Sequence, residues 1–277
     1  MASAEDFWKE ALSSWAIPTE ILDAAPESPW GFPVEVFASR ADASTETFTP
    51  SNGAALEALP DGGAVLDIGC GGGAASLPLA ARAGRLVGVD TSAQMLEAYT
   101  ERAAAAGLPP EGLETIEGPW PDVASRTPIA DVVVCNHVAY NAPELDEFAF
   151  ALTDHARHRV VIELTATHPL SNMSDLWLRF HGIERPRRPT ADDAEAVLRE
   201  IGLAPERTNW IAEGGGGFAR REDLVAFVRR RLCLPATRDA EIAAAFSSQV
   251  EERRSRFGFV GRPVVTLWWD GVAPRTD

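Results

Sequence analysis

The feature that most constrains the fold of this chain is the stretch VLDIGCGGGAASLPLA, from Val65 to Ala80. An apolar run ends in an acidic residue, a cluster of glycines follows, and an alanine-rich segment comes next. A glycine-rich turn between a buried strand and a helix lets the backbone approach a ligand closely, and N–H groups at the helix N-terminus favour an anion. The stretch therefore predicts a ligand site at the end of a strand.

The glycines by themselves are compatible with two cofactors. Gly69, Gly71 and Ala74 match G-x-G-x-x-A, a weak signal for a nicotinamide dinucleotide site. Asp67 lies two residues before the first glycine, where a negative charge is unfavourable beside a pyrophosphate but suits a ligand with an ammonium group. Asp90 ends the next apolar run and can accept hydrogen bonds from both hydroxyls of a ribose, although dinucleotide folds use such an acid too.

Strand-like apolar runs alternate with helical patterns from about residue 66 to 162. Continuous Val, Ile and Leu runs are typical of strands buried on both faces of a parallel sheet. Strand–helix alternation predicts a doubly wound α/β sheet with its ligand beyond the carboxyl ends of the strands. The five runs are AVLDIG, RLVGVD, LETIEG, DVVVCN and RVVIELT.

The pattern changes after the fifth run. We expect a helical insertion at about 168–189, in which Met173, Trp177 and Phe180 have helical spacing. A helix with Thr190 as N-cap and Asp193 three residues on follows, just as a helix with Ser92 as N-cap follows the second run. These aromatic residues, with Phe218, either wall an apolar acceptor pocket or pack an extra helix on the sheet. The remaining expected elements are a strand at ERTNWIA, helices at about 220–232 and 237–254, and a last strand at PVVTLWWD.

The first 50 residues are unusually aromatic for a terminal segment. We expect residues 1–50 to form a helical cap that covers a sheet edge or lids the pocket, and residues 51–277 to form the main domain. The aromatic residues in question are Trp8, Trp15, Trp30, Phe32, Phe37 and Phe48.

Composition limits the partners. The 277 residues carry a formal net charge of −16, which repels a polyanion at long range and favours a small-molecule partner over nucleic acid. No apolar run approaches a membrane span, and there is no secretory signal. The three cysteines, Cys70, Cys135 and Cys233, match no zinc spacing, and no other residue cluster has metal-site spacing. We expect a reduced, cytoplasmic protein without a metal, and leave a homodimer as one alternative.

The two motifs together resemble a known family. VLDIGCGGGAASLPLA is similar to the first motif of class I S-adenosylmethionine-dependent methyltransferases, and LVGVDTSAQMLEAY to their second-strand segment. The resemblance covers roughly residues 50–203. It implies a Rossmann-like seven-stranded sheet whose last strand is antiparallel, with S-adenosylmethionine as methyl donor and S-adenosylhomocysteine as product.

The resemblance also implies roles for single residues. The Gly69–Gly73 backbone would cradle the methionine part, Asp67 would orient its amino group, and Asp90 would hold the ribose. Many relatives have Gly-Asp where this chain has Gly118-Pro119-Trp120, so Trp120 either packs on the adenine or is a core aromatic, and Asp122 is a possible replacement acid. The expected cofactor residues are Asp67, Gly69, Cys70, Gly71, Gly73, Asp90, Thr91, Met95, Gly118, Trp120 and Asn136.

Catalytic candidates should follow the fourth and fifth strands. Methyl transfer from a sulfonium is an in-line displacement, and a general base is needed only if the nucleophile must lose a proton. The candidates are His137, Tyr140 and His168, each with a structural alternative. We expect transfer to a small, partly apolar acceptor at oxygen, nitrogen or carbon. A non-catalytic cofactor-binding member of the fold, a nicotinamide-dependent oxidoreductase and a macromolecular acceptor remain alternatives.

Overall fold

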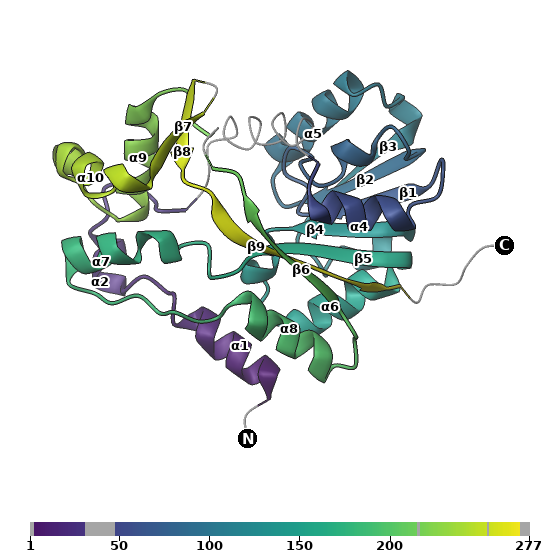
Figure 1. Ribbon diagram of the computed structural model, residues 1–277, viewed down its shortest axis with the longest axis horizontal. Helices are drawn as coiled ribbons and strands as arrows, with labels where there is room; N and C mark the ends of the chain where they lie inside the picture. The colour runs from purple at the N-terminus through teal and green to yellow at the C-terminus, as the bar shows by residue number, and fades with distance from the viewer. Residues whose placement is uncertain (1–2, 31–47, 215–216, 254, 272–277) are drawn as a thin grey trace.

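The computed structural model describes residues 3–30, 48–214, 217–253 and 255–271 (Figure 1). Seven strands form one sheet in the order β3-β2-β1-β4-β5-β9-β6. The first five pair in parallel, whereas β9 runs antiparallel to both of its neighbours. This confirms the predicted fold class. The strands are β1 (Ala64–Ile68), β2 (Arg85–Asp90), β3 (Leu113–Glu117), β4 (Ala130–Asn136), β5 (Ala156–Thr165), β6 (Glu206–Ala212) and β9 (Arg262–Asp270).

Helices cover both faces of the sheet, as the continuous apolar strands require. Alternate residues of one strand enter different cores: Leu66 and Ile68 lie in one apolar cluster, and Val65 lies in the other. Two helices, α4 (Pro50–Ala58) and α5 (Ala93–Ala105), pack on the Val65 face. The opposite layer contains α1 (Ala4–Ser13), α6 (Leu145–Asp154) and α8 (Ala191–Glu200).

A smaller lobe with its own apolar core lies beyond the carboxyl ends of the parallel strands (Figure 1). Register places it there, because Thr165 at the end of β5 pairs with Val264 near the start of β9. The lobe therefore lies at the edge of the sheet where ligands bind in this fold class. Its elements are α2 (Thr19–Asp23), α7 (Ser174–His181), α9 (Arg221–Arg231), α10 (Asp239–Ala245), β7 (Val250–Arg253) and β8 (Arg256–Phe259).

Two expected helices are wrong. The segment after the glycines forms turns and one short 3-10 helix at Leu77–Leu79, because Pro78 has no N–H to donate to a longer helix. The helix expected at 237–254 ends at Ala245, and the β7–β8 hairpin replaces its second half. Since this hairpin and α9 share the core of α7, the small lobe extends well past the insertion expected at 168–189.

The N-terminal segment packs on the helical layer rather than on a sheet edge. Trp8 of α1 is fully buried, and its indole Nε1 donates to the Ala142 carbonyl at 2.8 Å. Trp15 follows the helix, and its Nε1 donates to the Arg188 carbonyl at 2.7 Å. Phe32 and Phe37 lie outside the described residues, so the cap is seen only in its first part and in Phe48, which is exposed.

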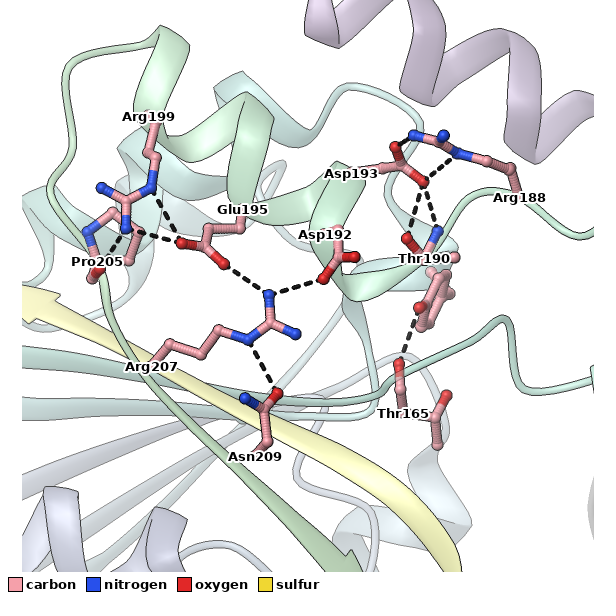
Figure 2. A network of polar contacts seen from close by, with 11 residues as sticks. Thr165, Arg188, Thr190, Asp192, Asp193, Glu195, Arg199, Pro205, Arg207 and Asn209 are labelled. Atoms are coloured by element: carbon pink, nitrogen blue, oxygen red, sulfur yellow. Dashed lines mark hydrogen bonds and ion pairs between the residues drawn. The ribbon is translucent and has the colours of Figure 1, made fainter.

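A polar network ties α8 to the edge strand β6 (Figure 2). Arg207 of β6 donates to Asp192 and Glu195, both at 2.7 Å, and Arg199 donates to the other Glu195 oxygen at the same distance. At the helix start, Thr190 and Asp193 form the predicted capping box. Within the described part of the chain, no helix is long and apolar enough to cross a membrane.

Candidate functional site

Asp67 is a buried carboxylate at the end of β1 with one unpartnered oxygen. Its Oδ2 accepts a hydrogen bond from Ser76 Oγ at 2.6 Å, and that hydroxyl lies 2.9 Å from Tyr99 Oη. Its Oδ1 is buried and has no hydrogen-bond partner among the described residues. Burial raises the pKa of Asp67 to about 7; the Ser76 hydroxyl opposes the shift, and the Asp90 charge adds to it. A cationic donor would therefore be stabilised here.

At two glycines after Asp67, neighbouring side chains pack so closely on the backbone that a Cβ atom would clash with them. Gly69 has a φ of +69°, and a Cβ on it would lie 2.3 Å from Val138 Cγ2. Gly73 has a φ of +89°, and its Cβ would meet Leu77 and Tyr99 below 3 Å. Glycine is required at both positions for conformation and for space.

Four N–H groups of the loop are already used inside the protein. Gly69 and Cys70 both donate to the Val89 carbonyl, at 2.8 and 3.0 Å. Gly73 donates to the Cys70 carbonyl at 2.7 Å, and Gly71 donates to Asp90 Oδ2 at 2.9 Å. Since no α-helix begins here, the expectation of helix N-terminal N–H groups for an anion is wrong.

Asp90, at the end of β2, is held in place by the backbone. Its Oδ2 accepts from Gly71, and its Oδ1 accepts from the Ser92 N–H at 2.9 Å. Each carboxylate oxygen can still accept a second hydrogen bond. Ser92 caps α5 as predicted; exposed Thr91 and buried Met95 lie beside this cap.

Asn136, at the end of β4, adds a second unpartnered acceptor. Its Oδ1 is buried, and nothing in the described ranges donates to it. Asp67 pairs with Val134, two residues earlier on β4, so the Asp67 and Asn136 side chains point to the same face of the sheet. This face therefore presents acceptors for a ligand that carries an ammonium group and hydroxyls.

Trp120 packs against α6 and the residue that precedes β5. Its ring meets His155 edge-on, with 4.9 Å between centroids, and His155 directly precedes the amino end of β5. Its Nε1 donates to the Phe148 carbonyl of α6 at 3.4 Å. These contacts favour the core alternative: Trp120 is partly buried and packs against the apolar cluster that contains Leu66. Gly118 is needed by its turn, because a Cβ there would lie 2.3 Å from Val123 Cγ1.

His137 directly follows β4 and is paired with a buried carboxylate. Its Nε2 lies 3.1 Å from Glu163 Oε1, and its backbone N–H donates to the Glu163 carbonyl at 2.6 Å. The His137 side chain is 39% exposed, whereas that of Glu163 is 7% exposed. His137 has a φ of +63°, a conformation that non-glycine residues rarely adopt and that is enriched at functional sites.

Glu163 is held from its other side by a chain of hydroxyls. Ser51 of α4 donates to Glu163 Oε2 at 2.5 Å and lies 2.7 Å from Thr266 Oγ1. Burial alone raises the pKa of Glu163, but the hydrogen bond and charge of His137, the Ser51 hydroxyl and Arg262 together bring it below its usual range. The carboxylate is therefore charged at neutral pH.

The sequence of this chain is similar to those of known proteins. Residues 65–158 match the model of a family described as a methyltransferase domain. An uncharacterized protein of Haemophilus influenzae is 33% identical over 209 residues, which cover 75% of this chain and 76% of the relative.

Two solved structures are similar in fold. The YcgJ protein of Bacillus subtilis has a TM-score of 0.50 at 17% identity, covering 80% of this chain and 99% of that one. Magnesium protoporphyrin IX methyltransferase of Synechocystis, solved with bound S-adenosylhomocysteine, has a TM-score of 0.47 at 17% identity over 94% and 95% of the two chains.

The chain carries a methyltransferase domain, in the fold of the class I S-adenosylmethionine-dependent methyltransferases.

The methyltransferase assignment replaces the nicotinamide-dependent oxidoreductase alternative. It also agrees with the chemistry of the sheet edge, where Asp67 Oδ1 and Asn136 Oδ1 are unpartnered acceptors among the described residues. Among the described residues no group of three or more His, Cys, Asp or Glu is arranged to hold a metal ion.

The other two catalytic candidates of the methyltransferase lie in a packed aromatic cluster. Tyr140 Oη donates to the Thr165 carbonyl at 2.8 Å, and burial raises its pKa above the usual range. His168 stacks on Trp15 with 3.9 Å between centroids and meets Tyr140 edge-on at 5.3 Å. Burial, with the charge of Arg185, lowers the pKa of His168 to about 3. Neither group is placed as His137 is, beside a charged partner and open to solvent.

The aromatic stripe of the insertion forms the small lobe's core. Met173, Trp177 and Phe218 are buried in it, which favours the packing alternative over a pocket wall. A cavity of about 280 Å³ does lie in this lobe of the methyltransferase. Its lining includes Phe218, Phe227, Arg229, Arg230 and Arg256.

Sequence reasoning missed the parts of the site that depend on pairing between distant segments. Glu163 was visible as a charged residue within an apolar strand, but its contact with His137 depends on strand register. Ser51 carried no signal in the sequence, because α4 reaches β5 only in the folded chain.

Proposed function

We propose that this methyltransferase binds S-adenosylmethionine at the carboxyl ends of β1, β2 and β4 and transfers its methyl group to a small, partly apolar acceptor. One observation carries the proposal: two buried acceptor oxygens, Asp67 Oδ1 and Asn136 Oδ1, are unpartnered on one face of adjacent strands within the described structure. Buried polar atoms in native proteins are normally hydrogen-bonded, so such a pair indicates a ligand with donors.

The residues fit the parts of the cofactor. Its ammonium group would meet Asp67 and Asn136, its ribose hydroxyls Asp90, and its methionine chain the closely packed loop from Gly69 to Gly73. Thr91 and Met95 would lie along the adenosine. When bound, the cofactor supplies a methyl group on a positively charged sulfur, which a nucleophile can displace in line.

The acceptor is proposed to be a small molecule. The net charge of −16 disfavours a nucleic acid, and the small lobe beyond the sheet edge has a largely apolar core. Cys70, Cys135 and Cys233 are free thiols, which supports a reducing, cytoplasmic location.

Calorimetric titration with S-adenosylhomocysteine tests the proposal. We expect a single site in the wild type and a loss of at least about tenfold in affinity in Asp90→Ala, because hydrogen bonds to a charged group contribute about 1.5–3 kcal/mol. Glu114→Gln is the matched control, since Glu114 lies on the next strand and pairs with Arg85 at the surface. Failure of the wild type to bind, or equal affinity in Asp90→Ala, contradicts the proposal.

A non-catalytic role is distinguished by turnover. The enzyme should release S-adenosylhomocysteine from S-adenosylmethionine in the presence of a suitable acceptor. Tight binding without any methylated product over a broad acceptor panel would support a cofactor-binding protein instead.

A further inference from the structure

We propose that His137 acts as a general base through Nδ1, that Glu163 is its positioning residue, and that the methylated group is a hydroxyl. This inference rests on the proposed methyl-transfer function and names the substrate class that the same site serves. It is carried by the contacts around His137 and Glu163.

The pairing decides which imidazole nitrogen is basic. An ionised carboxylate can only accept hydrogen bonds, so the 3.1 Å contact between Glu163 Oε1 and His137 Nε2 places the imidazole proton on Nε2. The lone pair of the neutral ring is then on Nδ1. Because the His137 side chain is 39% exposed although its partner is buried, the ring remains accessible beyond this contact.

The carboxylate that selects this tautomer is itself rigidly held. Its second oxygen accepts from Ser51, Ser51 contacts Thr266, and Trp210 Nε1 donates to Thr266 Oγ1 at 3.1 Å. Ser51 and Thr266 are at most 2% exposed. Such a buried hydroxyl chain fixes the angle at which Glu163 meets the imidazole.

Strand register places this chain beside the cofactor residues. Asn136 pairs with Glu163, and Glu163 pairs with Thr266, so the three side chains form a polar row on the same face as Asp67. His137 follows Asn136 directly. The base is thus one residue along the chain from a proposed cofactor contact.

The presence of a built base restricts the acceptor. A carboxylate or thiolate needs no base, and a neutral amine attacks through its lone pair and can lose its proton afterwards. A hydroxyl is a poor nucleophile until its proton is removed, and therefore benefits most from a base in the transition state. The arrangement favours a phenolic or alcoholic acceptor.

In the proposed methyl transfer, the hydroxyl oxygen forms a bond to the methyl carbon while the carbon–sulfur bond breaks. The electron pair of that bond stays on sulfur. The hydroxyl proton passes to His137 Nδ1. The resulting imidazolium is stabilised by the Glu163 carboxylate.

Nitrogen NMR on histidine-labelled protein tests the pairing without any turnover. The chain has five histidines, and His137→Gln assigns the signal. We expect the neutral His137 ring to be protonated on Nε2 in the wild type, and Glu163→Gln to shift its nitrogen resonances and populate both tautomers. A ring protonated on Nδ1, or a spectrum unchanged in Glu163→Gln, overturns the inference.

Kinetics on matched acceptors test the chemistry. With substituted phenols and the corresponding anilines as probes, methylation is expected at phenolic oxygen. His137→Gln should lower kcat by about 10²–10⁴-fold, the usual range for a lost general base, with the affinity for S-adenosylhomocysteine unchanged. Glu163→Gln should lower kcat by at least about tenfold with little change in the acceptor KM. Turnover of anilines alone, or full activity in His137→Gln, overturns the assignment.

A buried carboxylate elsewhere provides the control. Asp193 is 4% exposed, and its carboxylate accepts hydrogen bonds from Thr190 at the start of α8 and from Arg188 (Figure 2). Asp193→Asn should lower stability but leave the His137 resonances and kcat unchanged. The wild type's binding of S-adenosylhomocysteine separates the two proposals: if it binds while the His137 results fail, only the base assignment is lost.

Discussion

Asp67 is a single residue whose burial opposes its own charge. A carboxylate with a pKa of about 7, against an ordinary 3.8, is disfavoured in its charged form by burial. In the free protein the charged form of Asp67 is therefore destabilised, and a cationic ligand would stabilise it. A buried carboxyl group with a shifted pKa, on the same face as a second unpartnered acceptor, is a frequent feature of binding sites.

The affinity for S-adenosylhomocysteine should consequently depend on pH. Binding requires the Asp67 carboxylate, so below about pH 7 a proton must be released and the affinity should fall by about tenfold per pH unit. Titrations between pH 8 and about pH 5.5 measure this slope. Asp67→Asn should bind more weakly and show no such slope; a wild-type affinity independent of pH contradicts the role of Asp67.

The same variant should be more stable than the wild type at high pH. Because the folded pKa is raised, Asp67 contributes stability below about pH 3.8 that is lost as pH rises through 7. The stability difference in favour of Asp67→Asn should grow between these values and level off above them. At pH 8 we expect a Tm higher by a few degrees; a lower Tm in the variant would argue against a charged, buried Asp67.

Gly69 offers a prediction based on shape alone. Gly69→Ala combines a left-handed φ with a close contact to Val138, and should cost about 2–4 kcal/mol of unfolding free energy. Adding Val138→Ala should recover the contact part only. Gly107→Ala is the control, because its φ is +86° but nothing lies within 4 Å of the new Cβ. Denaturant unfolding measures the free energy of unfolding of these three variants. An equal loss in Gly69→Ala and Gly107→Ala would refute the proposed contact with Val138.

Single-residue roles could be predicted from sequence where a motif was local. The acid before the glycines and the acid ending β2 both lie at the expected edge. The use of the loop N–H groups could not be foreseen, because it depends on the Val89 carbonyl across the strand and on the failure of a helix to form at Pro78. Trp120 was ambiguous, since the same aromatic suits an adenine face or a core.

At the scale of elements, α4 joins the two halves of the site. Its capping box at Thr49 sets the helix start, which places Ser51 against Glu163 and lets Asn52 donate to the Ala75 carbonyl at 3.3 Å. The start of α4 thus contacts both Glu163, the proposed partner of the base His137, and the segment after the glycine loop. This explains why polar residues begin a helix that is otherwise packed on an apolar face.

The network between α8 and β6 supports the edge of the sheet. Burial raises the pKa of Glu195, but its hydrogen bonds with Arg207 and Arg199 outweigh burial and lower it. Arg207→Met should cost about 1–2 kcal/mol of unfolding free energy at neutral pH. This loss should shrink as pH falls from about 4.5, the ordinary glutamate value, through the lower pKa of Glu195 in the folded protein.

An exposed pair provides the comparison for Arg207. Arg220 and Asp223 form an ion pair at the start of α9 with 70% and 41% of their side chains exposed. Arg220→Met should therefore leave chemical denaturation unchanged. Equal effects of the two arginine variants would contradict a structural role for the network in Figure 2.

Elements with strong local signals were predictable, and those decided by tertiary contacts were not. Continuous apolar runs, the Ser92 cap and the Thr190–Asp193 box all lie where the sequence indicated. The β7–β8 hairpin was read as a helix, because arginines and glutamates at 250–254 have no strand pattern by themselves. It forms where Phe257 and Phe259 reach the small lobe's core.

The whole molecule combines a cofactor sheet with a lobe that lies over its functional edge. The chain enters the lobe from that edge between β5 and α7 and between β6 and α9, and it returns to the sheet between β8 and β9 (Figure 1). The acceptor is thus expected between the sheet edge and this lobe. The small lobe was the least predictable part, because its core assembles from segments separated by up to about 240 residues of chain.

Ligand binding should stabilise the molecule by mass action. At 100 times its dissociation constant, S-adenosylhomocysteine should add about 2.7 kcal/mol, provided that it binds only the folded chain. Thermal unfolding should therefore show a Tm that rises with ligand concentration in the wild type, and rises less at equal concentration in Asp90→Ala. A Tm independent of ligand would contradict binding.

The central claim is that the acceptor oxygens at the ends of β1, β2 and β4 form the cofactor seat, and a crystal structure with S-adenosylhomocysteine tests it most directly. We predict the ligand's amino nitrogen within hydrogen-bond distance of Asp67 or Asn136, and its ribose hydroxyls on Asp90. A ligand bound elsewhere, or with its amino group away from both oxygens, would contradict the account.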